Sequence, residues 1–243
     1  MPALDGMRIL DMTQYEAGTS CTQALAWFGA DVVKVERPGI GDPGRGRARG
    51  QDDSDYFLVW NSNKRSIAVD LEKPAGRELL LQMLPHYDVF VENYGPGVIE
   101  KLDLGYDVMK AVHPEIIYAR LKGFGTSGPY ADYKCFDMVA QAAAGAFSIT
   151  GEADGPPMRP GPTTGDAGTG VQLALAITAA YAQKMRTGVG QLIEISMQEA
   201  MTYYLRTAIA GTQGGKKVAA RSGNGMGPIV NIYPCDPHGP NDY

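Results

Sequence analysis

Residues 8–36 read RILDMTQYEAGTSCTQALAWFGADVVKVE, and this segment indicates the class of fold. Its two ends, 8–12 and 31–36, are short runs rich in aliphatic residues, which we interpret as strands. The segment between them has the composition of a helix. We expect that helix to begin at Ser20, which opens a capping-box sequence, and to end at Gly29. A strand, a helix and a second strand within about thirty residues form a βαβ unit.

Strand-like and helix-like segments keep alternating along the rest of the chain. We expect further strands at 66–71, 88–92, 115–121, 191–197 and 229–233, and helices at 74–84, 138–146 and 168–185. The last of these helices is apolar nearly all round, so it should be buried. This order of elements is typical of an α/β domain built on a mostly parallel sheet with flanking helices.

The composition is that of a globular protein with an acidic balance. Of the 243 residues, 44% are hydrophobic and 20% are charged, and the net charge of −5 argues against a general nucleic-acid binder. Cys21, Cys135 and Cys235 form no CxxC pair, which favours a reducing compartment. The N-terminus has no signal-peptide pattern, and the longest uncharged run, 167–183, contains glutamines and threonines. We therefore expect a cytoplasmic protein without a membrane span.

Common nucleotide-binding motifs are missing. Glu36 ends the second strand, where dinucleotide-binding proteins carry an acid that binds ribose, but the turn at 13–18 has one glycine where G-x-G-x-x-G is required. Gly215 and Lys216 are followed by Lys217 rather than serine or threonine, so a P-loop is not supported. None of the three histidines has metal-ligand spacing, and we interpret them as structural or surface residues: His86, His113 and His238.

The segment GDAGTG at 165–170 lies directly before the apolar helix and carries a single carboxylate, Asp166. In the simplest interpretation Asp166 is the N-cap of that helix and accepts hydrogen bonds from its first amides. Three glycines in six residues exceed what capping needs, and they would let another molecule approach the backbone. The positive end of a helix also stabilises a carboxylate and a neighbouring oxyanion. The sequence therefore makes Asp166 a candidate nucleophile toward a carbonyl group as well.

Several collinear motifs carry a resemblance that spans Leu4 to the last residue. They are LDG (4–6), GADVVKVER (29–37), NKRSI (63–67), ENYGPG (92–97) and GDAGTG (165–170). In these motifs the sequence resembles CoA-transferase family III, the group of formyl-CoA:oxalate, carnitine and bile-acid CoA-transferases. The resemblance implies a Rossmann-like large domain over 1–220, then a glycine-rich loop and linker at 221–243. It also implies a second, smaller domain that this chain lacks, and an interlocked homodimer.

The same resemblance implies an activity and its residues. Asp166 matches the aspartate that attacks an acyl-CoA thioester, giving a mixed anhydride and then an aspartyl-CoA thioester, from which CoA passes to a carboxylic acid. No tightly bound cofactor is implied, because CoA and acyl-CoA are substrates. The implied CoA-binding residues are Glu16, Ala17, Arg37, Val69, Asp70, Leu71, Asn93, Tyr94, Gly95, Lys101, Lys134 and Asp137. Gly223, Gly225 and Gly227 resemble a loop that closes over the intermediate, although a plain flexible linker remains the alternative.

Some positions depart from the family pattern or allow an ordinary interpretation. Glu16 stands where the formyl-CoA transferases carry glutamine, and Tyr15 where they carry a small apolar residue, so the identity of the substrate is open. Glu72 occupies a family lysine position, with Lys73 adjacent. Taken alone, Arg37 would be a surface partner of Glu36, and Lys101 and Lys134 would be solvated surface charges.

Two other functions remain as alternatives. Family III also contains α-methylacyl-CoA racemases, which use a histidine just before the aspartate that matches Asp137. Here the preceding residues are Lys134, Cys135 and Phe136, which favours transfer over racemisation. The second alternative is a non-catalytic CoA-binding subunit, against which Asp166 in its glycine-rich setting argues.

Overall fold

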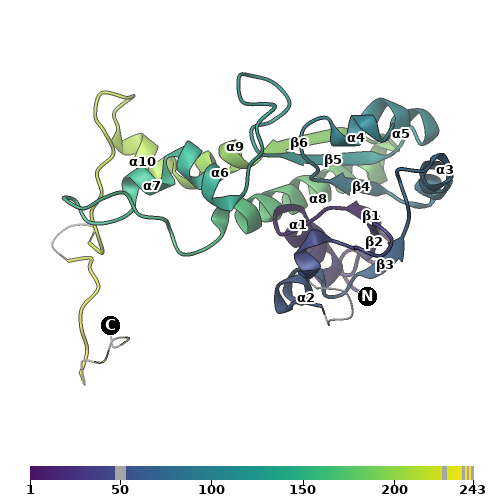
Figure 1. Ribbon diagram of the computed structural model, residues 1–243. Coiled ribbons are helices and arrows are strands. Elements are labelled where there is room, and N and C mark those ends of the chain that lie inside the picture. Colours follow the sequence, from purple (N-terminus) through teal and green to yellow (C-terminus); the bar gives the residue numbers. More distant parts are fainter. Residues whose placement is uncertain (47–52, 226–228, 237–238, 240, 242–243) are drawn as a thin grey trace.

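A computed structural model describes residues 1–46, 53–225, 229–236, 239 and 241 (Figure 1). In this part of the chain six strands form one sheet in the order β3-β2-β1-β4-β5-β6, and every neighbouring pair is parallel. The strands are β1 (Arg8–Met12), β2 (Asp31–Glu36), β3 (Arg65–Ala68), β4 (Val89–Glu92), β5 (Ile117–Lys122) and β6 (Leu192–Ser196). The predicted α/β class with a mostly parallel sheet is therefore confirmed.

Helices lie on both faces of this sheet and beyond its end (Figure 1). They are α1 (Ala17–Trp27), α2 (Asp55–Asn61), α3 (Pro74–Met83), α4 (Val98–Lys101), α5 (Tyr106–Val112), α6 (Asp137–Ala144), α7 (Ala146–Ile149), α8 (Thr169–Thr187), α9 (Met197–Tyr204) and α10 (Arg206–Gly211). A π-helical turn, Thr164–Gly168, leads directly into α8. The helices α6, α7, α9 and α10 gather to the left of the sheet in Figure 1, where the chain continues as an irregular tail.

Side chains along the buried strands point alternately to the two faces of the sheet, so the core has two layers. Ile9 of β1 packs in the cluster that contains residues of α1 and α8, whereas Leu10 and Met12 pack in the cluster that contains Leu80 of α3 and Ile99 of α4. Four of the five residues of β1 are fully or almost fully buried. Central strands of a parallel sheet read as continuous apolar runs for this reason, because helices cover both faces.

The strand order places a crevice between β1 and β4. The chain leaves these two neighbouring strands in opposite directions, β1 toward β2 and β3, and β4 toward β5 and β6. Ligands of open α/β sheets bind outside the carboxyl ends of the strands at such a switch point. The loop after β1 contains Glu16 and the loop after β4 contains Asn93, so the fold brings two of the predicted CoA-binding segments together.

The βαβ unit predicted at 8–36 is confirmed, but its helix begins earlier than predicted. Helix α1 begins at Ala17, with Glu16 as the N-cap. Ser20 lies inside the helix, where its hydroxyl donates to the Ala17 carbonyl at 3.0 Å, so the predicted capping box is wrong. Gly29 does end this segment, because it adopts φ +105°, a conformation that glycine tolerates without strain.

Two further expectations are wrong. Residues 229–233 form no strand: they have irregular backbone and solvent-exposed side chains, because no neighbouring strand offers them a hydrogen-bond ladder. Helix α8 is buried on one side only. Leu173 and Ile177 are fully buried, but Val171 and Leu175 are 58% and 71% exposed.

Among the described residues no helix is both long and apolar enough to cross a membrane. The division of the chain at residue 220 stays a prediction.

Candidate functional site

Asp166 lies in the π-helical turn at the start of α8, and its side chain is buried, with 8% of the residue exposed. It does not cap the helix, because the N-cap position of α8 belongs to Gly168 and no side chain bonds there. Within the described part of the chain, the Asp166 carboxylate accepts no hydrogen bond and has no ion-pair partner. The predicted N-cap role is therefore wrong, and the carboxylate stays available for chemistry.

The backbone of this turn is held by Asp137, the first residue of α6. Its Oδ1 accepts the amides of Gly165 at 2.9 Å and of Asp166 at 3.2 Å. Gln141, one turn along α6, donates to both oxygens of Asp137 at 2.9 Å and 2.8 Å. Asp137 was expected to line the CoA site. In this structure its carboxylate instead accepts hydrogen bonds from the backbone of the turn that carries Asp166.

The three glycines around Asp166 pack against the protein itself. A Cβ on Gly165 would lie 2.7 Å from the Asp137 carbonyl oxygen, and one on Gly168 would lie 2.9 Å from the Tyr204 ring. A Cβ on Gly170 would lie 2.0 Å from Ser20 Oγ. The expectation that these glycines open the backbone to another molecule is therefore wrong for these positions, because close contact between elements of the chain explains them.

Glu16 brings a third carboxyl group to the same place. It precedes α1 and is only 4% exposed. Thr163, the residue before the π-helical turn, donates its hydroxyl to Glu16 Oε1, and the Tyr56 hydroxyl lies 3.5 Å from Oε2. Among the described residues Glu16 has no cationic partner. Three segments far apart in sequence therefore bring three carboxyl groups together. We use the name acidic chamber for this cluster of Glu16, Asp137 and Asp166.

The electrostatics of the acidic chamber favour protons. Burial, together with the negative charges of Glu16 and Asp137, raises the pKa of Asp166 to about 7. Burial and the charge of Asp137 raise the pKa of Glu16 as well, although hydrogen bonds from Thr163 and Tyr56 oppose this. Burial also raises the pKa of the nearby Cys135 thiol to about 11, with the same two aspartates adding to the effect, so the thiol stays neutral at pH 7.

The loop after β1 is tied to the loop after β4 by Asn93. Its side-chain Oδ1 accepts the Gln14 amide at 2.7 Å, and its Nδ2 donates to the Gln14 carbonyl at 2.9 Å. Both polar atoms of the Asn93 side chain are thereby paired with backbone. Asn93 was predicted to bind CoA, and its side chain fixes the geometry of the switch point.

A buried ion pair beneath the same loop was missed by the sequence analysis. Lys34 of β2 and Asp42 lie 2.8 Å apart, and both side chains are almost fully buried. Lys34 also donates to the Thr13 carbonyl at 2.6 Å, and Asp42 accepts the Tyr15 amide at 3.1 Å. Tyr15 has φ +58°, a strained conformation for a bulky residue. A lysine inside an otherwise apolar strand was the signal that could have pointed to this pair.

Five of the predicted CoA-binding residues line one small groove at the switch point. The groove has a volume of about 120 Å³, and its lining includes Arg37, Val69, Asp70, Leu71 and Tyr94. Arg37 lies just beyond β2 and is exposed, and it pairs at 3.3 Å with Glu72 rather than with Glu36, so the expected surface pair is wrong in its partner. Glu36 pairs instead with Arg45 at 2.6 Å.

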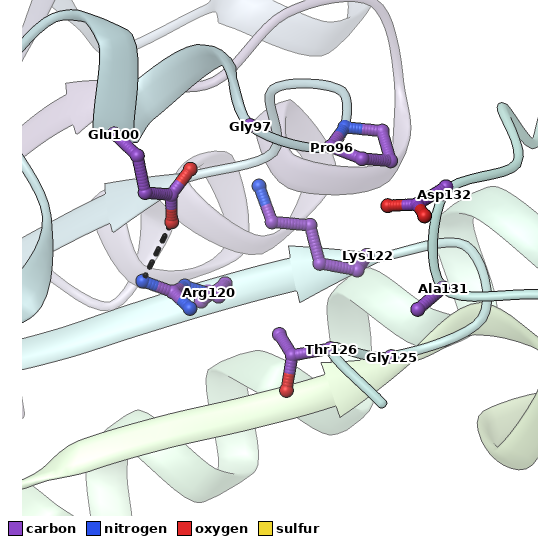
Figure 2. A pocket seen from close by; sticks show the side chains of 9 residues that line it. All are labelled: Pro96, Gly97, Glu100, Arg120, Lys122, Gly125, Thr126, Ala131 and Asp132. Atoms are coloured by element: carbon purple, nitrogen blue, oxygen red, sulfur yellow. Dashed lines mark ion pairs between the residues drawn. The ribbon is translucent and has the colours of Figure 1, made fainter. Parts of the chain in front are cut away.

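A second cavity of about 220 Å³ lies beside the loop after β4 (Figure 2). Lys122, at the end of β5, points toward Pro96 and Gly97, while Arg120 points toward Glu100 (Figure 2). The Lys122 ammonium donates to Glu92 at 2.9 Å and to the Tyr94 carbonyl at 2.6 Å, which supports the loop between this cavity and the groove. The sequence analysis missed Glu92 and Lys122, although charges at the ends of two apolar strands were visible.

The remaining predicted residues make no side-chain contact, among those described, with the acidic chamber or the groove. Lys101 and Lys134 are exposed and form no ion pair within the described residues, whereas Ala17 is buried at the start of α1. Gly95 has an open surrounding. The Gly223 amide donates to the Gly151 carbonyl at 2.9 Å, and none of the described contacts of Gly223 or Gly225 is with Asp166. Gly227 and His238 lie outside the described residues.

In the part of the chain that is described, no group of three histidine, cysteine or acidic side chains is arranged to hold a metal ion. A buried carboxylate without a hydrogen-bond partner, at the start of a long helix, has the character of a nucleophile.

Known sequences resemble this chain over most of its length. The model of CoA-transferase family III matches residues 4–239. A formyl-CoA:oxalate CoA-transferase of Rhodopseudomonas palustris (strain BisA53) is 46% identical over 213 residues, which cover 87% of this chain and 50% of the relative. One of Streptomyces avermitilis is 42% identical over 259 residues, covering 99% of this chain and 63% of the relative. The chain thus spans about half to two thirds of the length of these curated relatives.

Solved structures agree with the fold. A CAIB/BAIF family protein from Brucella suis matches with a TM-score of 0.86 at 34% identity, covering 92% of this chain and 60% of that one. A hypothetical protein from Mycobacterium tuberculosis matches with a TM-score of 0.81 at 33% identity, covering 88% of this chain and 59% of that one.

Proposed function

The chain belongs to CoA-transferase family III, and from this premise we propose that it moves CoA from an acyl-CoA donor to a free carboxylic acid. The observation that carries the proposal is Asp166, a buried carboxylate that no side chain or amide of the described residues engages. The relatives named above support the reaction class, since their names describe CoA transfer between two acids.

In the proposed mechanism Asp166 is the covalent nucleophile. Its carboxylate attacks the thioester carbonyl of the donor, and the carbon–sulfur bond breaks. CoA departs as a thiolate, and a mixed anhydride between Asp166 and the donor acyl group remains. The thiolate then attacks the aspartyl carbonyl, which releases the donor acid and leaves an aspartyl-CoA thioester. The acceptor carboxylate displaces the thiolate from this thioester to form a second anhydride. Attack of the thiolate on the acceptor carbonyl gives the new acyl-CoA and free Asp166.

This sequence of steps needs neither an external oxidant nor a net proton transfer. It needs a deprotonated nucleophile, a held thiolate and the exclusion of water, which would hydrolyse the anhydride. The burial of Asp166 supports the last requirement. Its raised pKa of about 7 leaves a substantial fraction of the carboxylate deprotonated at neutral pH.

The groove at the switch point is the proposed site of the nucleotide end of CoA. Arg37 lines it from the end of β2, and a guanidinium suits both phosphate and adenine. Gln14 lines the same groove, and Glu16 of the acidic chamber follows two residues later. The loop after β1 would thus run between the nucleotide and the reacting thioester. Lys101 and Lys134 are proposed as further phosphate contacts, because their ammonium groups are exposed.

Racemisation is the less favoured alternative. It requires an acid and a base on opposite faces of an α-carbon, with pKa values near neutrality. The position before Asp137 is Phe136, which has no ionisable proton, and burial raises the pKa of the Cys135 thiol to about 11. We expect no exchange of the α-proton of a 2-methylacyl-CoA in heavy water, while CoA passes to an added acid.

Assembly and location are proposed as well. Val171, Leu175 and Met185 leave an apolar strip of α8 exposed, 58%, 71% and 68% respectively, which supports burial of this strip in a homodimer. Sedimentation of the full chain tests this, since a monomer at micromolar concentration would contradict it. The sequence further supports a cytoplasmic location, which fractionation of cells would test.

The decisive experiment for the reaction traps the intermediate. The full chain is incubated with several acyl-CoAs and candidate carboxylic acids, and the CoA products are identified by mass spectrometry. Hydroxylamine added with the donor alone should convert Asp166 to a hydroxamate, which peptide mass spectrometry locates. The Asp166→Ala variant should bind CoA within about tenfold of the wild type and transfer none. Undiminished turnover in this variant would refute the assignment.

A further inference from the structure

The acidic chamber brings together three carboxyl groups, and no cation of the described residues pairs with them. Glu16, Asp137 and Asp166 are each less than one-tenth exposed, and none of them forms an ion pair within the described residues. Glu16 and Asp137 both act on Asp166 as negative charges, and Asp137 acts likewise on Glu16. Like charges in a buried site oppose the arrival of another negative charge.

Glu16 is held in this chamber from several sides. Its carboxyl is bonded by Thr163, which precedes the turn carrying Asp166. Its backbone follows three residues that are each fixed by a neighbour. Lys34 bonds the carbonyl of Thr13, Asn93 bonds both backbone groups of Gln14, and Asp42 bonds the amide of Tyr15. Movement of the Glu16 carboxyl out of the chamber would therefore disrupt a buried network.

The three carboxyl groups differ in how far their own contacts neutralise them. Asp137 accepts two backbone amides and the Gln141 amide, so donors surround its charge. Within the described part of the chain Glu16 accepts hydrogen bonds from hydroxyl groups alone, those of Thr163 and, at 3.5 Å, of Tyr56. Of the charges near Asp166, that of Glu16 is therefore the least compensated by hydrogen-bond donors, and a substrate beside Asp166 would be repelled by it.

We propose that Glu16 makes this site selective for acids that carry one negative charge, and that it discriminates against acids with a second carboxylate. The inference rests on the proposed function, since it concerns the acid that reaches Asp166. The reacting carboxylate loses its charge when it becomes an anhydride, whereas a second carboxylate keeps its charge throughout the reaction. The penalty therefore falls on the second charge in both the bound and the acylated states.

Matched acids isolate charge from size. Oxalate and oxamate differ by one charge at nearly equal size, and so do succinate and succinamate. The readout is the ratio of kcat/KM for the singly charged acid to that for the doubly charged acid, with one acyl-CoA donor throughout. We expect the wild-type ratio to be at least about tenfold in each pair, which corresponds to about 1.4 kcal/mol.

The Glu16→Gln variant removes the charge and keeps the size. We expect its ratio to fall toward one, by at least about fivefold, because the chamber then repels a second carboxylate less. The matched control is Glu78→Gln, which removes an exposed charge on α3 whose hydrogen bond is to Gln82 at 3.3 Å. The control should keep the wild-type ratio. A ratio that is unchanged in Glu16→Gln, or a wild type that prefers the doubly charged acids, overturns the inference.

A second measurement does not depend on the folding of a variant. In the wild type the ratio of kcat/KM for oxamate to that for oxalate should decline as the pH is lowered over the range in which the enzyme is active, because the raised pKa of Glu16 lets protons neutralise its charge at a higher pH than that of an ordinary glutamate. Loss of active Asp166 at low pH affects both acids equally and cancels in the ratio. A ratio that stays constant or rises over this range contradicts the inference.

Failure of the proposed function can be told apart from failure of this inference. If no donor passes CoA to any acid, the transferase proposal fails. The four acids are then titrated calorimetrically into the protein with CoA present. Tighter binding of the singly charged acids, abolished in Glu16→Gln, supports the inference without turnover. Equal binding within each pair, or no binding of any of the four acids, overturns it.

Discussion

Oδ1 of Asp137 accepts the backbone amide of Asp166 at 3.2 Å, and the amide of Gly165 at 2.9 Å. One carboxylate thus holds the backbone of another without touching its side chain. The first group shapes the turn, and the second stays without hydrogen bonds in the described residues. Asp137 is therefore best regarded as a positioning residue for Asp166, the proposed nucleophile.

Replacing Asp137 should separate this positioning role from CoA binding. Asp137→Ala leaves two buried amides unpaired, and we expect it to lower the free energy of unfolding by about 1–3 kcal/mol and kcat by at least about tenfold. Asp137→Asn should retain most of both, since its carbonyl can still accept the amides and Gln141 Oε1 has no hydrogen-bond partner at present. Denaturant unfolding and steady-state kinetics measure the two effects. A large change in Kd for CoA with kcat preserved would instead place Asp137 at the nucleotide.

The pH dependence of transfer should report the carboxyl group of Asp166. Its pKa of about 7 means that the nucleophile is protonated and inactive at low pH, so kcat/KM should fall as the pH decreases through about 7. Removing the charge of Glu16 in Glu16→Gln weakens the repulsion and should shift the midpoint to lower pH by about one unit. Initial rates over the pH range check this. A midpoint that stays in place or moves upward would show that Glu16 does not act on Asp166.

CoA affinity should depend on Arg37 and on its neighbour Glu72. Arg37→Ala removes a charge-assisted contact, and we expect Kd for CoA to rise by about tenfold to a hundredfold while kcat changes little. Glu72 pairs with Arg37 at 3.3 Å, so Glu72→Gln should free the guanidinium and tighten binding. Calorimetric titration with CoA measures both. Unchanged affinity in Arg37→Ala would leave Arg37 an ordinary surface charge.

The buried pair of Lys34 and Asp42 should be important for stability. Lys34→Met leaves Asp42 without its partner in the interior, and we expect the free energy of unfolding to fall by about 3–5 kcal/mol. Arg65→Met is the matched control. Its pair with Asp31 has side chains that are 69% and 47% exposed, so the loss should stay below about 1 kcal/mol. Equal losses in the two variants, measured by denaturant unfolding, would contradict this account.

The contact between α1 and α8 should tolerate no side chain at Gly170. A Cβ there would lie 2.0 Å from Ser20 Oγ and 2.5 Å from the Ala17 carbonyl oxygen, which is backbone and cannot turn aside. We expect Gly170→Ala to cost about 1–3 kcal/mol of stability. Gly161→Ala, where nothing lies within 4 Å of the new Cβ, is the control and should be neutral. Thermal unfolding distinguishes the two, and equal midpoints would contradict the contact.

The α/β architecture and the candidate nucleophile could be predicted from local signals in the sequence. Strands such as 8–12 and 31–36 were predicted with correct bounds because they are buried on both faces, which makes them continuous apolar runs. The helix predicted at 168–185 matches α8 to within two residues at its C-terminal end, where Gly188 takes φ +70° just after Thr187. Asp166 was found because its motif is local. Each of these signals lies within a few consecutive residues, so periodicity and motif are sufficient to detect it.

The surroundings of Asp166, in contrast, depend on the folded chain. Glu16 and Asp137 lie far from it in sequence, and the sheet order together with the packing of α1 against the π-helical turn brings the three carboxyl groups together. The same packing explains Gly170, whose role could not be predicted while its neighbour Ser20 was taken as a helix cap. Distant partners leave no periodic trace along the chain. Burial and pairing, which set the pKa of a carboxyl group, therefore depend on the assembled fold.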